Sequence, residues 1–390
     1  MIILIPALLV LSALYWAFVA LQLLRAMRQV PQLAELQPPP PPRWPRLSLV
    51  IPACDEEATL EPALRSRLRE DYPELELVVI DDRSTDATGA IVDRVAAEDA
   101  RVRALHIRSL PEGWLGKVHA LHRGVEQASG EWLLFTDADV HLEPGTLRTA
   151  VAYCESRGLD HLGVFPEVWS ASFRLDVALG TFGRLVALAA RPHAVEDPRS
   201  RAAFGVGAFN LVRRSALERS PGLSWLRLEL LDDAALGQML KRSGARCGMA
   251  MGRGRVGLTF YPSLRELARG TEKNGFAGAG RFSQLRLVLF CLTLLALEGT
   301  PFAALLAFGH PLVQLAGGAI AALAVGASMV GSRWMARPVL PNLLLPLGTL
   351  FFVGCLLRSG YLAHRRGGIA WRGTLYPTAL LRAGARYEFP

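Results

Sequence analysis

Residues 2–24 form one uncharged and almost entirely apolar segment, and this segment restricts the fold of the chain more than any other feature. A helix of this length crosses the hydrocarbon core of a bilayer. Arg25 and Arg28 follow it, and no Lys or Arg precedes Arg25, whereas a cleaved signal peptide carries positive charge before its apolar stretch. We therefore expect residues 1–24 to be a transmembrane anchor, with the amino terminus outside and the following chain in the cytoplasm.

A second apolar block covers residues 285–362 and predicts two or three more membrane segments, ahead of a basic carboxy-terminal tail at 363–390. Its segments are residues 285–308, 311–331 and 341–362. If all three crossed the membrane, the basic run 364–366 would lie outside, against the positive-inside tendency. We therefore expect one segment not to cross. Residues 285–297, about 20 Å long as a helix, are our candidate for an interfacial or re-entrant piece.

Glu298 is an ionisable residue inside this apolar block, and two interpretations stay open. An ionisable side chain at membrane depth is a functional candidate by default. Alternatively, Glu298-Gly299-Thr300-Pro301 is a polar break between two short helices.

The charge balance indicates a membrane surface rather than nucleic acid as the partner of the chain. The sequence carries 43 basic and 35 acidic side chains, and only three of the basic ones are lysines, at positions 117, 241 and 273. The arginines are dispersed without an aromatic-basic platform, which argues against a nucleic-acid interface and favours attraction to anionic lipid headgroups. The five cysteines show neither Cys-x-x-Cys nor zinc spacing, so we expect neither a disulfide framework nor a metal cluster.

Strand-like and helix-like segments alternate between the apolar blocks, which predicts an α/β fold with a doubly wound, mostly parallel sheet over residues 46–283. A Pro-rich linker at 25–45, with a polyproline run at Pro38–Pro42, is expected to hold this domain away from the anchor. The predicted strands cover residues 47–52, 75–81, 102–107 and 132–136, and the predicted helices cover 56–70, 85–98, 117–128 and 144–156. Residues 171–191 have an amphipathic helical pattern, which suits either a core-facing or an interfacial helix.

Candidate metal ligands follow the fourth predicted strand. The buried apolar run Trp132–Thr136 leads directly into Asp137 and Asp139, two carboxylates separated by one residue. Such a pair suits Mg²⁺ or Mn²⁺ and leaves coordination positions for diphosphate oxygens. Open α/β sheets bind ligands beyond the carboxyl ends of their strands, where this pair would lie. The alternative is that both aspartates are ordinary turn or helix-cap residues.

The first two predicted strands also end in polar residues. The first ends in Pro52-Ala53-Cys54-Asp55-Glu56-Glu57, where a dinucleotide-binding fold would have Gly-x-Gly-x-x-Gly, so NAD and FAD are disfavoured. The second ends in Asp81-Asp82-Arg83-Ser84-Thr85-Asp86. One of these aspartates would accept the N3–H of a uracil, whereas the alternative is helix capping, with Ser84 or Thr85 as the cap.

Later segments add further candidates. Lys117 follows Gly113–Gly116 at the start of a predicted helix, where it either reaches a diphosphate or lies exposed. The Gly-x-Gly within residues 204–210 suits a bulged strand or a backbone that approaches a sugar. Asp232 and Asp233 begin a helix running to residue 242, and capping explains one of them while a general base explains the other.

In this order the motifs resemble those of inverting glycosyltransferase family 2, which has the GT-A fold. The resemblance extends from about residue 46 to 283. It rests on Val50-Ile51-Pro52 with an acidic follow-up, Asp81-Asp82-x-Ser-Thr-Asp, Gly116-Lys117, Asp137-Ala-Asp139 and the late acidic pair. The apolar segments at both ends make the chain similar to membrane-bound lipid glycosyltransferases, among them ceramide glucosyltransferase-like enzymes and hopanoid- and carotenoid-associated bacterial enzymes.

The resemblance implies a role for each candidate. Asp233 would be the catalytic base, and Asp137 and Asp139 would hold Mg²⁺ or Mn²⁺. The nucleotide sugar would be bound by Asp55, Glu56, Asp82, Lys117, Asp137, Asp232, Arg269 and Lys273. Two departures stand out: Asp232 replaces the usual Glu, and no Gln-x-x-Arg-Trp is present, since Arg265–Asn274 lies at about its place. The missing motif argues against processive polysaccharide synthesis.

The implied activity is inverting transfer of a single sugar from a nucleotide sugar, preferably a UDP-sugar, to the hydroxyl of a membrane lipid. The resemblance places the protein in a bacterial-type inner membrane with its catalytic domain in the cytoplasm. The alternatives are a membrane-bound nucleotidyltransferase, a polysaccharide synthase and a catalytically silent membrane partner. The late acidic pair favours sugar transfer, and acidic residues at all four motifs argue against a silent partner.

Overall fold

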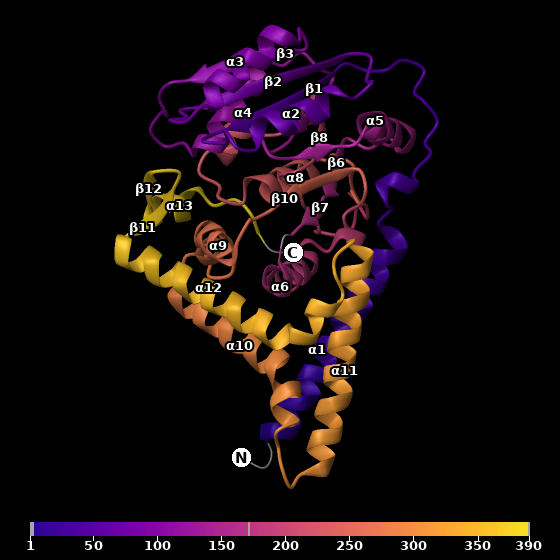
Figure 1. Ribbon diagram of the computed structural model, residues 1–390, viewed down its shortest axis with the longest axis vertical. Coiled ribbons are helices and arrows are strands. Elements are labelled where there is room, and N and C mark those ends of the chain that lie inside the picture. Colours follow the sequence, from indigo (N-terminus) through magenta and orange to yellow (C-terminus); the bar gives the residue numbers. More distant parts are fainter. Residues whose placement is uncertain (1–3, 171, 389–390) are drawn as a thin grey trace. The chain divides into compact units, whose positions relative to one another are not determined.

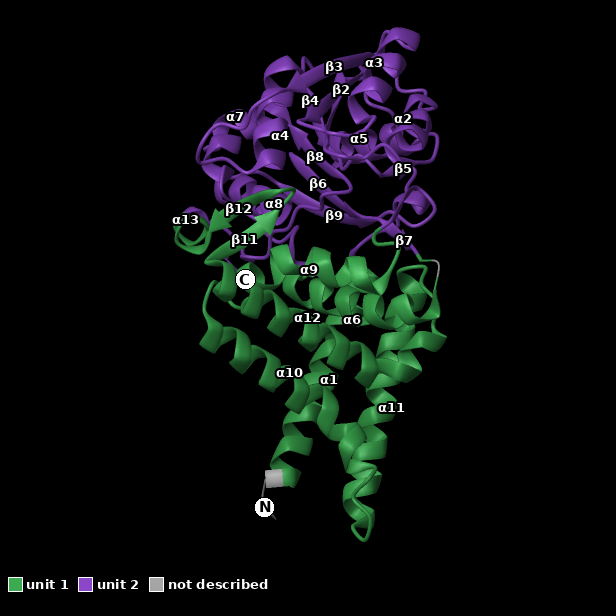
Figure 2. Ribbon diagram, turned by 60° about the vertical axis from the view of Figure 1, so that its left-hand side comes forward, with its two compact units in different colours: residues 1–29, 170–191, 260–383 green, residues 30–169, 192–259, 384–390 purple. Residues whose placement is uncertain are grey.

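The computed structural model describes residues 4–170 and 172–388 (Figure 1). It consists of two compact units (Figure 2). The sheet unit comprises residues 30–169, 192–259 and 384–390, and the helical unit comprises residues 1–29, 170–191 and 260–383. The boundaries differ from the expected linear domains, because residues 170–191 and 260–283 cluster with the apolar helices and not with the sheet.

A seven-stranded sheet with the order β3-β2-β1-β4-β8-β6-β9 forms the core of the sheet unit. Its strands are β1 (Leu47–Ala53), β2 (Leu75–Asp82), β3 (Val102–Ile107), β4 (Trp132–Phe135), β6 (His161–Phe165), β8 (Asn210–Arg213) and β9 (Cys247–Met251). Only β8 runs antiparallel to its neighbours. The apolar side chains of β1, β2 and β4 are buried on both faces, as expected for parallel strands covered by helices. The predicted α/β fold with a mostly parallel sheet is confirmed.

The helices that connect these strands lie close to their expected positions. They are α2 (Leu60–Leu68), α3 (Thr88–Glu98), α4 (Gly116–Gln127) and α5 (Thr146–Arg157), followed later by α7 (Arg214–Arg219) and α8 (Asp232–Arg242). A small second sheet joins β5 (His141–Leu142), β10 (Val256–Thr259) and β7 (Glu167–Trp169). In that sheet Gly257 must be glycine, because a Cβ there would lie 2.3 Å from the Trp169 ring.

The strand register brings four chain segments to one edge of the large sheet. β1 lies between β2 and β4, and the chain reverses its direction of winding between β1 and β4. This switch point is where open α/β sheets bind ligands. Because β8 is antiparallel, its first residue Asn210 pairs with Phe135, the last residue of β4. The segment before β8 therefore meets the carboxyl ends of β1, β2 and β4.

The residues on either side of the polyproline run contact the sheet unit. Helix α1 extends to Gln29, and the residues after it belong to the sheet unit. Leu33 is fully buried, and the carbonyl of Pro31 accepts a hydrogen bond from the Met251 amide at 2.9 Å. Arg43 makes two hydrogen bonds to Glu131, at 2.8 and 2.7 Å. The linker therefore contacts the sheet unit at residues 31–33 and at Arg43, while the polyproline run between them is extended and largely exposed.

The helical unit contains α1 (Leu4–Gln29), α6 (Phe173–Ala190), α9 (Leu264–Gly278), α10 (Gln284–Ala304), α11 (Pro311–Trp334) and α12 (Leu345–Arg366). Four helices in the described chain are long and apolar enough to cross a membrane: residues 5–29, 284–304, 311–334 and 340–366. The expectation of a short interfacial or re-entrant helix ending at residue 297 is wrong, because α10 continues through Pro301 to Ala304. Residues 363–388 are likewise not the unstructured basic tail that the term implied, since α12 continues to Arg366 and further elements follow. Residues 368–377 form the hairpin of β11 (Gly368–Trp371) and β12 (Thr374–Pro377), α13 (Thr378–Gly384) follows, and residues 384–388 join the sheet unit.

Glu298 lies in the middle of α10 and connects four helices. Its carboxylate accepts hydrogen bonds from Tyr15 at 2.7 Å, Arg184 at 2.7 Å and Thr349 at 2.5 Å, and it is fully buried. A buried carboxylate is stable only with such partners. The interpretation of Glu298 as a polar break between two helices is therefore wrong, since the residue joins α1, α6 and α12 to α10.

Candidate functional site

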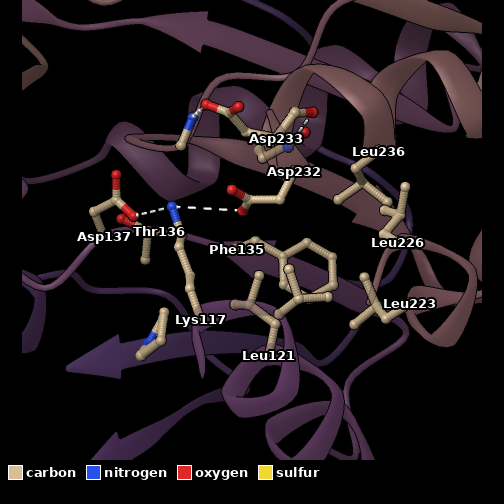
Figure 3. A pocket seen from close by; sticks show the side chains of 14 residues that line it. Lys117, Leu121, Phe135, Thr136, Asp137, Leu223, Leu226, Asp232, Asp233 and Leu236 are labelled. Atoms are coloured by element: carbon tan, nitrogen blue, oxygen red, sulfur yellow. Dashed lines mark hydrogen bonds and ion pairs between the residues drawn. The ribbon is translucent and has the colours of Figure 1, made fainter. Parts of the chain in front are cut away.

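Lys117 lies between two predicted acidic motifs at the carboxyl edge of the large sheet. Its Nζ is 2.6 Å from Asp137 Oδ1 and 3.7 Å from Asp232 Oδ2 (Figure 3). Burial alone lowers the pKa of Lys117, but the carboxylates of Asp137, Asp232 and Asp233 hold this pKa well above its usual range. The remaining cavity is small, about 10 Å³, because the lysine and the apolar side chains around it fill the space. The expected exposed position of Lys117 is therefore excluded.

Asp233 lies in the first turn of α8 and directs its carboxylate toward the segment before β8. Its Oδ2 accepts a hydrogen bond from the Gly207 amide at 2.9 Å, and its Oδ1 accepts one from the Ala234 amide at 2.8 Å. Burial and, after it, the neighbouring Asp232 raise the pKa of Asp233, while Lys117 opposes this shift. A carboxyl group with a raised pKa, fixed by two N–H donors, has the properties required of a general base near neutral pH.

Gly207 connects the two acidic motifs through its backbone. Its carbonyl accepts a hydrogen bond from the Asp137 amide at 3.0 Å, while its own amide donates to Asp233. A Cβ at this position would lie 2.7 Å from Asp137 Oδ2 and 3.2 Å from Asp233 Oδ2. The Gly-x-Gly pattern therefore marks a close approach of backbone to two carboxylates, for which only glycine leaves room.

We expect Gly207→Ala to lower the turnover number roughly 10²-fold, because the added methyl group must displace one of the two carboxylates by a fraction of an ångström or more. The thermal midpoint of unfolding should change little. A matched control is Gly326→Ala, where a Cβ meets nothing within 4 Å. Full turnover by Gly207→Ala would show that the positions of these carboxylates do not matter.

Asp139 and the buried Arg67 lie beside Asp137. Burial, and then the nearby charges of Asp137 and Glu56, raise the pKa of Asp139 to about 6. Arg67, on α2, is fully buried and donates a hydrogen bond to the backbone carbonyl of Asp137. Burial lowers its pKa to about 10, so it stays charged at neutral pH. Sequence analysis missed Arg67, since a single arginine in an amphipathic helix normally lies on the solvated face.

The residues at this edge suit a divalent cation that completes its shell with ligand oxygens. Among the described residues, no group of three or more His, Cys, Asp or Glu side chains is arranged to hold a metal. Asp137 and Asp139 supply two carboxylates, and Mg²⁺ in nucleotide sites is typically bound by one or two carboxylates together with substrate phosphates. The mutual repulsion that raises the pKa of Asp139 is the kind that a bound cation relieves. Lys117 contacts Asp137 and would have to yield part of that contact.

The loops after β1 and β2 hold each other in place. Asp55, which has a positive φ of 53°, accepts hydrogen bonds from the amide of Thr85 at 2.8 Å and from its hydroxyl at 3.2 Å. The amide of Glu56 donates to Thr88 Oγ1 at 2.8 Å. The cap of α3 is Ala87, so neither Ser84 nor Thr85 caps that helix as the alternative supposed. These contacts bring Asp55 and Glu56 next to the second acidic motif.

Asp82 is buried beneath the start of α4. It forms an ion pair with Arg83 at 2.8 Å, and a Cβ on Gly116 would lie 2.5 Å from its Oδ2. The structure therefore brings together Asp55, Glu56, Asp82, Lys117, Asp137, Asp139, Asp232 and Asp233, all in the sheet unit and at one edge of the sheet. The individual roles of these residues stay predictions.

Arg269 and Lys273 lie on α9 in the helical unit, whereas the other candidates lie in the sheet unit. Arg269 is exposed, and the ammonium of Lys273 is 4.7 Å from the centre of the Trp371 ring. Their contact with a nucleotide sugar stays a prediction.

The end of the chain reaches the sheet unit beside α8, which sequence analysis missed. The amide of Tyr387 donates to the buried Glu229 at 2.9 Å, and the amide of Glu388 donates to Gln238 at 3.0 Å. Tyr387 also packs edge-on against Phe204, with ring centres 6.3 Å apart. Hydrogen bonds from backbone amides to distant side chains leave no pattern in the sequence, although Tyr387 is an aromatic residue within the segment expected to be a basic tail.

His106 connects Asp81 with Asp93 and makes stability depend on pH. Its ring nitrogens lie 2.9 Å from Asp81 and 2.8 Å from Asp93, and these hydrogen bonds raise the pKa of His106. A raised folded-state pKa means that the stabilisation is complete below the unfolded value of about 6.5 and is lost as the pH rises through the folded value. His106→Gln should therefore lower stability by about 1 kcal/mol at pH 5.5 and by less at pH 8.5. Thermal midpoints at both pH values, with His310→Gln as the control, test this expectation. A pH-independent difference would contradict it.

Comparisons with known proteins agree with the motif order. Residues 48–220 match the model of glycosyl transferase family 2. The GalNAc(5)-diNAcBac-PP-undecaprenol beta-1,3-glucosyltransferase of Campylobacter jejuni is 33% identical over 105 residues, which are 27% of this chain and 33% of that protein. The poly(ribitol-phosphate) beta-N-acetylglucosaminyltransferase TarS of Staphylococcus aureus is 32% identical over 120 residues, which are 30% of this chain and 20% of that protein. The chain thus spans a third or less of the length of these relatives.

A solved structure extends the likeness to nearly the whole chain. The mannosyltransferase PcManGT from Pyrobaculum calidifontis, in complex with GDP-Man and Mn²⁺, matches with a TM-score of 0.55 at 19% identity. The match covers 93% of this chain and 99% of that one. The sheet unit therefore has a GT-A-like fold, and its residues 48–220 are similar to glycosyltransferase family 2. The narrower similarity to ceramide glucosyltransferase-like, hopanoid- and carotenoid-associated enzymes stays a prediction.

Proposed function

We propose that this protein transfers one sugar from a nucleotide sugar to the hydroxyl of a membrane lipid, with inversion at the anomeric carbon. The observation that carries the proposal is the position of Lys117, which joins the Asp137 motif to the Asp232-Asp233 pair within one half-buried site. A family 2 domain with both acidic motifs at one edge has the groups that sugar transfer requires, namely a binding site for diphosphate and a base.

In the proposed mechanism one proton is transferred, one bond forms and one bond breaks. Asp233 takes the proton of the acceptor hydroxyl as its oxygen forms a bond to the anomeric carbon, and the bond from that carbon to the diphosphate oxygen breaks, releasing a nucleoside diphosphate. The amides of Gly207 and Ala234 orient the Asp233 carboxylate. Lys117 supplies positive charge near the leaving diphosphate. Mg²⁺ or Mn²⁺, held by Asp137 and Asp139, would stabilise the negative charge that develops on the leaving group.

Nucleotide identity is part of the proposal. Asp55, Glu56 and Asp82 would contact the nucleoside, and the motif resemblance favours uridine. The GDP-Man bound by the mannosyltransferase with the similar fold makes guanosine the alternative. Competition of UDP against GDP at equal concentration, measured by displacement of a labelled nucleotide from the full-length protein, decides between them. Stronger displacement by GDP would overturn the uridine assignment.

The lipid acceptor is supported by the four long apolar helices and by one relative. The name of the Campylobacter jejuni enzyme specifies an acceptor linked to undecaprenol through diphosphate, which is a membrane-anchored molecule. An acceptor confined to the membrane is presented at high effective concentration to an enzyme anchored there.

Transfer should therefore depend on lipid. If the purified protein glycosylates a water-soluble acceptor equally fast, or makes a long polysaccharide, the lipid-acceptor proposal is wrong. Transfer of the nucleotide moiety would support the nucleotidyltransferase alternative, and no nucleotide-sugar turnover at all would support a silent partner.

A further inference from the structure

A large basic cavity lies in the helical unit and belongs to no part of the sugar-transfer mechanism. Its volume is about 620 Å³. Four of the residues that line it are basic: Arg281, Arg286, His364 and Arg382. None of the described residues that line it is acidic. The guanidinium of Arg382 donates to the backbone carbonyl of Phe282, a neutral partner, so its charge is not cancelled by that contact. The cavity therefore concentrates positive charge.

The cavity lies where two apolar helices meet. Gln284, the first residue of α10, donates to the carbonyl of Gly360 near the end of α12 at 2.6 Å. Leu285 in the first turn of α10 is 69% exposed, and Tyr361 near the end of α12 is 61% exposed. Large exposed apolar and aromatic side chains at the ends of membrane helices are typical of the boundary between hydrocarbon and headgroups. The basic lining thus adjoins a surface suited to lipid.

Contacts within the helical unit place this cavity on the basic membrane face. Gly317 packs against Ala304, so α10 and α11 form a hairpin. The side-chain amide of Asn342, just before α12, donates to the hydroxyl of Ser332 near the end of α11 at 2.9 Å. Helix α12 therefore starts near the end of α11. Because α12 ends near the start of α10, both ends of α12 lie on one face of the helical unit, as in a segment that does not cross.

The end of α1 lies on the same face. Gly331 of α11 packs against Leu23 of α1, and Arg25 and Arg28 follow directly after Leu23. The basic residues at the end of α1 and the basic run at 364–366 thus share one side, in agreement with the positive-inside rule. If all four segments crossed, the run 364–366 would lie on the side opposite Arg25 and Arg28, against the positive-inside rule. With α12 not crossing, both basic groups lie on the same side.

We propose that this cavity binds the phosphate of an anionic membrane lipid headgroup. Arginine side chains match phosphate oxygens in geometry and charge, and hydroxyls of Ser283 and Thr378 in the lining add neutral donors. Basic pockets between membrane helices on the cytoplasmic side are suited to such headgroups. A free phosphate shares this chemistry, but the lipid-facing side chains next to the cavity favour a ligand with acyl chains. The inference does not depend on sugar transfer.

The test uses Arg286→Glu in the full-length protein. Ser283 caps α10 by accepting a hydrogen bond from the Arg286 amide, so a glutamate at this position would complete a capping box and preserve the helix while it reverses the charge. Native mass spectrometry in detergent should show phosphatidylglycerol bound to the parent, with binding roughly 30-fold weaker in Arg286→Glu, because two units of charge are changed at about fivefold each. Arg28→Glu, an exposed arginine on the same face but outside the cavity, should bind within twofold of the parent.

Two further arms distinguish the sources of phosphate. Phosphatidylcholine should bind weakly to parent and variant alike, and millimolar inorganic phosphate should not displace phosphatidylglycerol. Complete displacement by inorganic phosphate would assign the cavity to a soluble anion and overturn the lipid proposal. Equal phosphatidylglycerol binding by the parent and Arg286→Glu would overturn the site itself. UDP binding, measured on the same samples, should be unchanged, so failure of this proposal is distinguishable from failure of the sugar-transfer proposal.

Discussion

Asp233→Asn is expected to lower the turnover number for sugar transfer by roughly 10²- to 10⁴-fold, the range over which a positioned general base contributes. The amide is nearly isosteric, so it retains an oxygen that can accept from Gly207, but it cannot take the acceptor proton. Because the base acts on the acceptor, the affinity for UDP and Mn²⁺ should stay within a few-fold of the parent. Single-turnover kinetics together with titration calorimetry of UDP separate these two quantities.

Asp197→Asn is the matched control for Asp233→Asn, since Asp197 is an exposed aspartate of the same unit, and it should be fully active. If Asp233→Asn instead loses UDP affinity in proportion to its activity, Asp233 belongs to the donor site. Full activity of Asp233→Asn would move the role of base to Asp232, whose carboxylate lies nearer Lys117.

Asp139→Ala should weaken Mn²⁺-dependent binding of UDP by about 10²-fold, because one of only two carboxylates available to the ion is removed. The parent should also bind metal and nucleotide less tightly below about pH 6. The raised pKa of Asp139, about 6, means that the carboxyl group becomes protonated as the pH falls through this value, and a protonated carboxyl is a poor metal ligand.

Electron paramagnetic resonance of bound Mn²⁺, titrated with UDP, measures this effect directly. Glu143→Ala is a suitable control, because Glu143 is an exposed acidic residue four positions further along the chain. Unchanged Mn²⁺ and UDP affinity in Asp139→Ala would refute the metal assignment for the Asp137–Asp139 pair.

The sequence predicted the local elements and the edge of the sheet at which the acidic motifs meet. Strand β3 has the predicted bounds, and β1, β2 and β4 differ from theirs by one residue at one end. These strands were readable because they are short apolar runs bounded by polar residues. The rule that ligands bind at the carboxyl ends of parallel strands indicated this edge for the Asp137 motif, and in the structure Asp82 lies at the end of the parallel strand β2.

The contacts that complete the site depend on segments far apart in the sequence. Arg67 acts through a backbone carbonyl 70 residues away, and the pairing of Lys117 with Asp137 and Asp232 required knowledge of how α4, β4 and α8 pack. The role of Gly207 depends on β8 running antiparallel to β4, which reverses the direction expected from simple alternation. A single sequence gives no signal for such pairings.

In the membrane segments, too, the sequence did not reveal contacts between distant residues. Hydropathy located all four apolar helices, but it left open a break at Glu298, because an acidic residue and a proline usually interrupt an apolar helix. The bonds from Arg184, Tyr15 and Thr349 satisfy that carboxylate within a continuous α10. Glu298 therefore interrupts the apolar sequence, whereas the helix α10 continues through it.

In the proposed reaction, Asp233 activates a hydroxyl of a membrane lipid to accept the sugar of a nucleotide sugar. The most direct measurement incubates full-length protein, reconstituted in vesicles of the host's extracted lipids, with sugar-labelled UDP-sugars and follows label into the organic-solvent-soluble fraction. We predict that the parent with Mn²⁺ labels one lipid species, whose mass increases by a single sugar, and that Asp233→Asn labels none. Label found only in free sugar or in water-soluble polymer, or labelled lipid formed equally by Asp233→Asn, would contradict this account.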